Sequence, residues 1–256
     1  MKAVYFLVWL ALAVPGWSQE RATDAVVLIP TVEESSSGEA FPVLLRPHKN
    51  AMHTLVSTGI RKKFIFKVYA FGLYLDQFQA QSQLEKWSKN NPAKLAKDKK
   101  FMAALLSGKI SMTVRWVMQR DVDAEDIAEA FVESLQPRID ALLKPSKGAG
   151  EKELAQVAKR MKETHLAFDT FRKFFAKDEI KEGTELIFTW LPAGIFRTSV
   201  GGIQQKDVQS AVLSQAFFDV YLGTDPITRL GREDFLAGLA DFLTPPKSAQ
   251  TYGQRK

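Results

Sequence analysis

Residues 58–76 read TGIRKKFIFKVYAFGLYLD and contain the strongest strand signal in the chain. From residue 64 to residue 75, apolar side chains occupy both alternating sets of positions, as in a central strand that is covered on both faces. Gly72 within this run predicts a bulge, or a close approach by a ligand or by backbone. We therefore expect a buried sheet with residues 64–75 near its centre.

A polar set interrupts this apolar run. Its members share one parity with Ile65 and Phe71 and therefore face the same side of a strand: Arg61, Lys63, Lys67 and Tyr69. A cation and a phenol that face an apolar interior are suited to hold an acidic head group. The alternative is that Arg61 and Lys63 lie at the exposed start of the strand while Lys67 extends outward to solvent.

Weaker signals of both kinds surround this stretch. Further strands are expected at residues 25–29, 41–46, 52–58, 110–118, 185–191 and 194–200. Helices are expected at residues 82–106 with an interruption at 90–92, after Asp123, at residues 150–176, after Asp207, and at residues 232–243. Pro192 and Ala193 join two of the strands in a hairpin. The chain has no internal repeat and no low-complexity boundary, so we expect one domain.

Two helices carry recognisable end signals. Asp123 is expected to cap a helix with Ile127, Phe131 and Leu135 on one face, and Pro137 is expected to follow its end. Asp207 is expected to cap the helix that follows it, and Gly223 is expected to end that helix.

The N-terminus has the three parts of a secretory signal peptide. Lys2 is followed by an unbroken apolar run at residues 4–14, and small residues precede a cut before Gln19. We therefore expect a signal peptide at 1–18, a domain at 19–243, a polar tail at 244–256 and a periplasmic location. The alternative is an N-terminal membrane anchor, although the apolar run is short for a bilayer span.

Composition excludes several classes of site. The chain of 256 residues has no cysteine, so disulfides, thiolate nucleophiles and cysteine-bound metals are excluded. With only three histidines (His48, His53 and His165), we expect no histidine-rich metal site, and we expect neither metal nor cofactor. The net charge of +6 falls short of a nucleic-acid footprint. A lysine-rich stretch at residues 86–100 indicates a solvated helix face, or alternatively a weak contact with anionic lipid headgroups.

Two stretches resemble motifs of the chalcone isomerase superfamily. Residues 58–76 resemble the signature strand region of that superfamily. Residues 216–226, AFFDVYLGTDP, resemble its late helix and the turn that follows. The resemblance extends over residues 40–243 and is strongest to bacterial chalcone isomerase-like proteins, many of which carry signal peptides.

The resemblance implies an α+β fold and a binding cleft. The fold is an open-faced sandwich, a large antiparallel sheet with helices layered on one face, and the cleft lies between sheet and helices. Plant chalcone isomerases cyclise a chalcone to a flavanone there. The related fatty-acid-binding members hold a fatty acid with an arginine and a tyrosine and do not perform this chemistry.

Few of the polar pocket residues of the chalcone isomerases are matched by the corresponding residues of this chain. Arg61 matches the arginine of the enzymes, and Tyr69 replaces their threonine, as in the fatty-acid-binding branch. The enzymes' tyrosine and asparagine fall near Ala124 and Phe131, and Val220 stands at the position of their late threonine or serine. Losing donors at the reacting oxygen costs orders of magnitude in rate, whereas apolar replacements suit an alkyl chain.

One departure weakens the expected clamp. The enzymes insert residues between the arginine and the strand with the threonine, whereas Arg61 and Tyr69 are eight positions apart. On one straight strand this separation is about 26 Å, too far for both side chains to hold one carboxylate. A shared site therefore requires a bend or bulge between them.

Three functions follow as hypotheses. The first is an exported, non-catalytic binder of a fatty acid or a similar small apolar acid, with Arg61, Tyr69 and Val220 at the ligand. The second is an isomerase, an intramolecular lyase with Arg61 as electrophilic catalyst. The third is a structural role in the envelope. An apolar tunnel that ends at Arg61 favours the first, convergent polar groups favour the second, and a filled sheet–helix interface favours the third.

Overall fold

The computed structural model describes residues 30–48, 51–175 and 179–243. The expected signal peptide, the strand at 25–29 and the tail at 244–256 lie outside these residues. The strands are β1 Thr31–Glu33, β2 Ala40–Pro42, β3 Leu44–His48, β4 Ala51–Lys63, β5 Phe66–Asp76, β6 Met112–Met118, β7 Val122–Asp123, β8 Glu179–Ile180, β9 Glu185–Leu191, β10 Ile195–Val200, β11 Ile203–Gln204 and β12 Val208–Gln209. The helices are α1 Gln77–Leu84, α2 Pro92–Lys97, α3 Lys99–Leu105, α4 Ala124–Leu142, α5 Glu151–Arg172, α6 Ala211–Leu222 and α7 Arg229–Leu243.

A large antiparallel sheet forms the centre of the molecule. In the described residues its strand order is β11-β10-β9-β6-β5-β4-β3, with β12 also paired to β10. Two short pairs, β1–β2 and β7–β8, lie outside it. Strand β5 runs between β4 and β6, and its residues from Tyr69 to Leu75 are buried. The expectation of a central strand covered on both faces is confirmed for this part of the quoted stretch.

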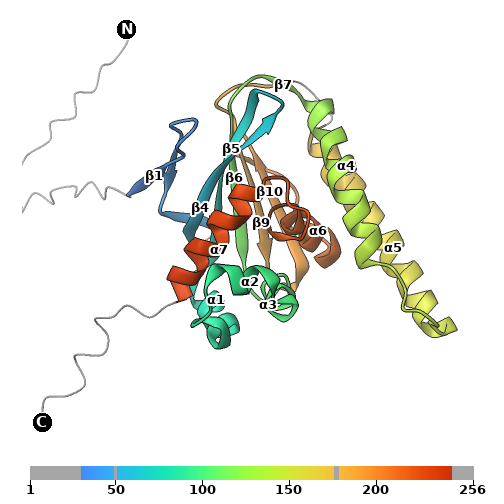
Figure 1. The fold of residues 1–256 in the computed structure, drawn as a ribbon. Helices are drawn as coiled ribbons and strands as arrows, with labels where there is room; N and C mark the ends of the chain where they lie inside the picture. Colours follow the sequence, from blue (N-terminus) through green and yellow to red (C-terminus); the bar gives the residue numbers. More distant parts are fainter. Residues whose placement is uncertain (1–29, 49–50, 176–178, 244–256) are drawn as a thin grey trace, which may run out of the picture.

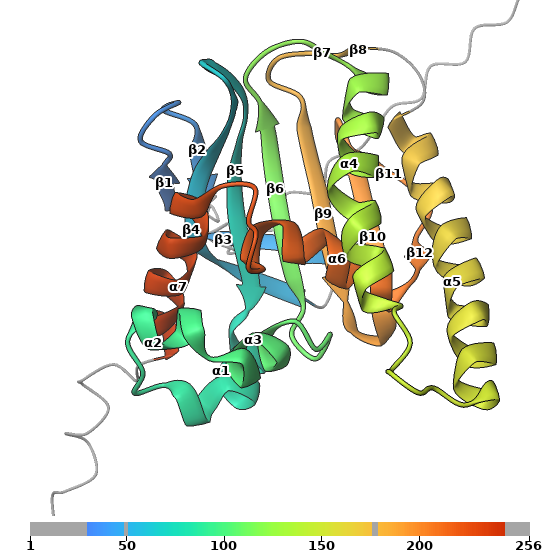
Figure 2. The same cartoon turned by 45° about the vertical axis from the view of Figure 1, so that its right-hand side comes forward.

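Helices α4 to α7 cover one face of this sheet, and α1 to α3 gather at one end of it (Figures 1 and 2). The expected α+β architecture, an antiparallel sheet with its helices layered on one face, is therefore confirmed. Helix α6 is apolar on nearly all sides and buried, as a helix enclosed by other elements should be. It packs against β10 of the sheet and against its neighbours α4 and α7.

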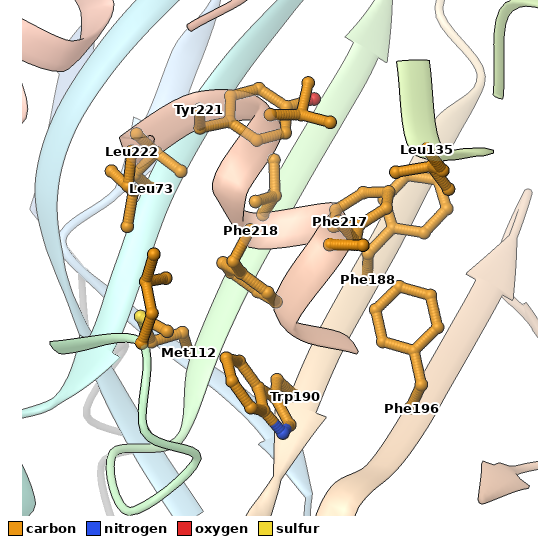
Figure 3. Packing of buried hydrophobic residues seen from close by; sticks show 14 of the residues in the cluster. Leu73, Met112, Leu135, Phe188, Trp190, Phe196, Phe217, Phe218, Tyr221 and Leu222 are labelled. Carbon is orange, nitrogen blue, oxygen red and sulfur yellow. The ribbon is translucent and has the colours of Figure 1, made fainter. Parts of the chain in front are cut away.

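An aromatic core joins the helices to the sheet. Phe217 of α6 has its ring centroid 4.7 Å from that of Phe188 on β9 and 5.0 Å from that of Phe196 on β10. Figure 3 shows these three rings together, with Leu135 of α4 beside them. Side chains of this size contribute most of the apolar area that stabilises a fold. The core therefore fixes α4 and α6 relative to the strands beneath them.

The quoted stretch is a hairpin, where a single strand was expected from residue 64. Strand β4 continues to Lys63, Phe64 and Ile65 form a two-residue turn, and β5 begins at Phe66. The turn contains none of the residues that usually signal one, so the apolar pattern conceals it. As a result, Arg61 and Tyr69 are directly paired across the two strands.

Gly72 also differs from expectation. Strand pairing is regular there, and the register shifts fall in β4 and its partner instead, between Leu55 and Ser57 and between Arg61 and Lys62. A Cβ atom at Gly72 would lie 2.7 Å from the ring of Phe41 and 2.8 Å from the ring of Tyr74. The glycine is therefore required by neighbouring side chains.

Helix boundaries account for the other corrections. Pro137 lies inside α4, which continues to Leu142, because on the exposed side of a helix the lost backbone bond can be replaced by water. Asp207 does not cap α6. It forms a bidentate ion pair with Arg197, and the cap is Ser210, whose hydroxyl accepts from the Leu213 amide at 3.2 Å. The C-terminal stop at Gly223 is confirmed.

Candidate functional site

A cavity of about 390 Å³ lies between the sheet and helices α4 and α6. Its volume falls in the range of pockets that bind small molecules. The walls are mainly apolar and come from β5, β6, β7, α4 and α6: Val68, Trp116, Met118, Val122, Ile127, Ala130, Phe131, Leu135, Phe217 and Val220. The sheet–helix interface is therefore not filled throughout, whereas a filled interface is the feature expected of a structural role.

Arg61 lies at one side of this cavity and is half-buried. Its Nη1 donates to the backbone carbonyl of Ile227 at 3.3 Å. Within the part of the chain that the structure describes, Arg61 forms no ion pair and no other hydrogen bond. A guanidinium has five N–H donors in a planar fork that matches a carboxylate. Most of these donors therefore remain for a ligand.

Tyr69 faces the same cavity from β5. Cross-strand partners project from the same face of a sheet, so the Arg61 and Tyr69 side chains are neighbours. The ring of Tyr69 stacks on Trp116 with centroids 3.9 Å apart, which fixes the position of its hydroxyl. The hairpin turn thus supplies the bend that a shared site requires.

A chain of hydrogen bonds connects three buried aromatic residues at this end of the cavity. The Trp116 Nε1–H donates to the Tyr221 hydroxyl at 2.7 Å, and the Tyr221 and Tyr69 hydroxyls are 3.3 Å apart. Because Tyr221 accepts from Trp116, its own proton is available to Tyr69. The Tyr69 proton is then available to an oxygen atom in the cavity. The chain ends in a donor and favours an anionic or carbonyl ligand atom.

Burial keeps both phenols protonated. It raises the pKa of Tyr69 to about 12, although the hydrogen bond with Tyr221 and the charge of Arg61 oppose the shift. Burial also raises the pKa of Tyr221 well above its ordinary value. Neutral phenols at pH 7 donate hydrogen bonds but do not accept protons as general bases. The site therefore provides a cation and neutral donors beside an apolar space.

The three residues predicted at the ligand line one cavity, whereas the other candidates do so only in part. Arg61, Tyr69 and Val220 all line the cavity, and so does Phe131, whereas Ala124 is buried at the start of α4 and does not. Lys63 lines the rim and is exposed, and Lys67 is exposed and does not line it. The polar set of the quoted stretch is therefore split: Arg61 and Tyr69 face the interior and the two lysines face solvent.

Tyr221 and Trp116 are the site residues that the sequence did not reveal. Both appeared as members of apolar patterns, one on the late helix and one on the strand at 110–118. The available signal was chemical, because a buried Tyr O–H or Trp N–H almost always has a hydrogen-bond partner. Two such groups in largely apolar elements predict that they meet each other or a ligand.

The described residues contain no group of three or more His, Asp or Glu side chains that could hold a metal ion. None of the described helices combines the length and apolar character that crossing a bilayer requires.

Comparison with known proteins gives consistent matches. Residues 45–236 match the sequence profile of the family described as chalcone isomerase-like. A fatty-acid-binding protein of Arabidopsis thaliana is 28% identical over 82% of this chain and 71% of its own length. A chalcone isomerase-like protein of Humulus lupulus is 29% identical over 74% of this chain and 81% of its own. The crystal structure of an Arabidopsis fatty-acid-binding protein superposes with a TM-score of 0.65 at 23% identity, covering 84% of this chain and 99% of that one.

Proposed function

This chain belongs to the chalcone isomerase-like family, and from this membership we propose that it is a non-catalytic binder of a fatty acid or a similar apolar carboxylic acid. The observation that carries the proposal is the cavity of about 390 Å³, which has apolar walls and the unpaired donors of Arg61 at one side. The fatty-acid-binding relative at 28% identity supports the same class of ligand.

The two parts of the cavity have separate roles in this proposal. The carboxylate lies between the Arg61 guanidinium and the Tyr69 hydroxyl, where it receives charge-assisted hydrogen bonds. The alkyl chain extends past Val220 and Phe131, and each fully buried methylene contributes about 0.8 kcal/mol. Affinity therefore rises with chain length until the cavity is filled and then levels off.

Titration with matched series of acids and alcohols tests the proposal. Arg61→Ala should weaken the acids far more than the alcohols, because only the acids lose a charged partner. Arg46→Ala is the control, since this arginine is exposed on β3 and does not line the cavity. Equal losses for acids and alcohols in Arg61→Ala would refute the head-group role. Absence of binding at every chain length would refute lipid binding itself. Organic extraction and mass spectrometry of the purified protein would identify a retained ligand.

The alternative is an isomerase with Arg61 as electrophilic catalyst. The convergence of Arg61, Tyr69 and Tyr221 on one end of the cavity favours it, because such donors can stabilise a developing oxyanion. Phe131 and Val220 oppose it, since they are apolar where the enzymes carry polar groups. The assay is loss of chalcone absorbance with chiral analysis of the product. We expect no enantioselective cyclisation, and rapid turnover that disappears in Arg61→Ala would establish the enzyme.

Export from the cytoplasm is a further part of the proposal. The N-terminal pattern favours a bacterial, signal-peptide-bearing member of the family in the periplasm, although the relatives compared above are plant proteins. Intact mass of the protein recovered from the cell envelope should correspond to a chain that begins at Gln19. A full-length product retained in the membrane would indicate an anchor instead.

A further inference from the structure

The tip of the β4–β5 hairpin is an exposed apolar surface. Three consecutive side chains there are open to solvent, with exposed fractions of 90% for Phe64, 84% for Ile65 and 57% for Phe66. Single exposed apolar residues are ordinary, but a continuous run of three at a projecting turn is costly in water unless it serves an interaction. We call these three residues the hairpin tip.

The backbone of the hairpin tip is also unusual. Phe64 has a φ of 57°, in the left-handed region that favours glycine. A two-residue hairpin with positive φ at its first central position normally has glycine there. Phenylalanine therefore occupies a position where glycine would fit with less strain. Strain that a chain retains at one position is evidence that the side chain has a use.

Basic residues surround the hairpin tip. Lys62, Lys63 and Lys67 flank it, all exposed, and no acidic residue occurs between residues 51 and 75. The Lys67 ammonium also donates to the Ser36 carbonyl, in the loop whose Ser36 and Ser37 amides donate to the Glu34 carboxylate. The guanidinium of Arg120, after β6, lies 5.9 Å from the ring centroid of Phe66. Acidic groups at this end lie on the loops and on α4. Asp121 and Glu179 pair with Lys181, and Asp126 lines the cavity.

We propose that the hairpin tip docks this protein on the surface of an anionic phospholipid bilayer. The apolar side chains enter the headgroup boundary, and the surrounding lysines and Arg120 bind the anionic headgroups. Charge complementarity favours a bilayer as the partner. The apolar tip matches the acyl chains, and the basic residues around it match the anionic headgroups above those chains.

The hairpin tip is adjacent to the cavity. Lys63, Val68 and Arg120 line the cavity and also lie beside the tip in sequence or by contact. Docking would therefore bring the cavity to the bilayer surface, where an apolar acid can enter it without crossing water. This last consequence rests on the proposed function, whereas the docking itself does not, since it is measurable with vesicles that contain no free fatty acid.

A second basic surface could bind anionic headgroups in place of the hairpin tip. The lysine-rich stretch at residues 86–100 belongs to the end with α1 to α3, away from the hairpin tip (Figure 1). Phe78 of α1 is 83% exposed at that end. It offers a matched control for an exposed phenylalanine, and the lysines of α2 and α3 offer a matched control for charge.

Sedimentation with vesicles tests the proposal. The vesicles are phosphatidylglycerol and phosphatidylcholine in a 3:7 ratio, compared with phosphatidylcholine alone, at low and high salt. The protein should bind the anionic vesicles, and high salt should weaken binding. Phe64→Gly should reduce affinity about tenfold. Each of Lys62→Gln, Lys63→Gln and Lys67→Gln should reduce it about fivefold. Phe78→Ser and the combined Lys94→Gln, Lys97→Gln and Lys100→Gln variant should bind as the wild type does.

Phe64→Gly separates docking from folding and from ligand binding. Glycine relieves the left-handed backbone, so the variant should keep or slightly raise the melting temperature while it loses vesicle affinity. Its affinity for acids in solution should not change, because Phe64 does not line the cavity. Absence of wild-type binding to anionic vesicles would overturn the proposal, as would full binding by Phe64→Gly. Equal losses in the control variants, or a dimer that Phe64→Gly dissociates without any vesicle binding, would also overturn it.

Discussion

Tyr221 shows how one polar atom organises the end of the cavity. Its hydroxyl accepts from the indole of Trp116 at 2.7 Å and lies 3.3 Å from the Tyr69 hydroxyl, all three residues being buried. A buried donor that loses its acceptor costs more than the bond itself contributed. The hydroxyl of Tyr221 should therefore contribute more to stability than that of Tyr69, because only Tyr221 accepts the hydrogen bond of the Trp116 N–H.

This asymmetry predicts different effects of two conservative changes. Tyr221→Phe leaves the Trp116 N–H without a partner and should lower the free energy of unfolding by about 1–3 kcal/mol. Tyr69→Phe should cost less stability, but should weaken acid binding about fivefold, the size of one hydrogen bond of about 1 kcal/mol. Urea unfolding and ligand titration of both variants measure the two effects. Equal destabilisation by the two changes would show that the indole does not depend on Tyr221.

His53 is the other residue with an unusual environment. It is fully buried, its Nδ1 lies 2.9 Å from the Thr113 hydroxyl, and that hydroxyl lies 2.9 Å from the hydroxyl of Thr189. Its Nε2 has no hydrogen-bond partner among the described residues. Burial lowers the pKa of His53 to about 4, although the charge of Asp76 opposes the shift. The folded protein therefore holds this histidine neutral.

A pH dependence of stability follows from that lowered pKa. The unfolded chain takes up a proton near pH 6.5 and the folded chain only near pH 4, so stability is complete above pH 6.5 and falls as the pH decreases to 4. At pH 5 the loss should be about 2 kcal/mol. Urea unfolding at pH 7 and pH 5 measures it. In His53→Gln the fall between these pH values should be smaller by this amount, and parallel profiles for the two proteins would contradict the assignment.

At the scale of elements, the hairpin shows what sequence patterns can and cannot reveal. The apolar run correctly placed β5 at the centre of the sheet, because burial on both faces leaves a pattern. It did not show the turn at Phe64 and Ile65, because turn prediction depends on Gly, Pro, Asn or Asp. The separation expected along one straight strand therefore does not apply to Arg61 and Tyr69, because the two residues are paired across a hairpin.

For the helices too, the sequence pattern predicts the buried face but not the ends. The apolar stripe of Ile127, Phe131 and Leu135 predicted α4, since these three residues belong to its buried face. The ends were less predictable, because Asp207 and Ser210 are both suitable caps and only the tertiary pairing of Asp207 with Arg197 selects between them. Arg61, Tyr69 and Val220 were located through motif resemblance. Tyr221 was not, because its neighbours on α6 made it look like core.

Packing between elements predicts the effect of a single methyl group. Gly72→Ala would place a Cβ 2.7 Å from Phe41 and 2.8 Å from Tyr74, so neighbouring side chains must move. Overpacking of this kind should lower the free energy of unfolding by about 1–3 kcal/mol. Phe41→Leu provides space, and the double variant should be less destabilised than the sum of the two single changes by at least about 0.5 kcal/mol. Strict additivity in urea unfolding would exclude this contact as the cause.

At the scale of the whole molecule, the sheet forms one wall of the cavity, and the β4–β5 hairpin belongs to that sheet. The sheet, α4 and α6 enclose the cavity. The hairpin that contributes Arg61 and Tyr69 ends in the exposed apolar tip (Figure 2). The helices α1 to α3 lie at the other end and contribute no residue to the cavity lining. Ligand binding should therefore stabilise the whole domain through α4, α6 and the sheet, which all contact the cavity.

A thermal-shift series tests this coupling. At a ligand concentration of 100 times the Kd, binding contributes about 2.7 kcal/mol to stability, which in a domain of this size raises the Tm by about 5–10 °C. The shift should grow with acid chain length at fixed concentration until the cavity is full. Val220→Phe reduces the space in the cavity, so its series should level off at a shorter chain while short acids shift the Tm as in the wild type. If both proteins level off at the same length, the alkyl chain does not pass Val220 and the orientation proposed for the ligand is wrong.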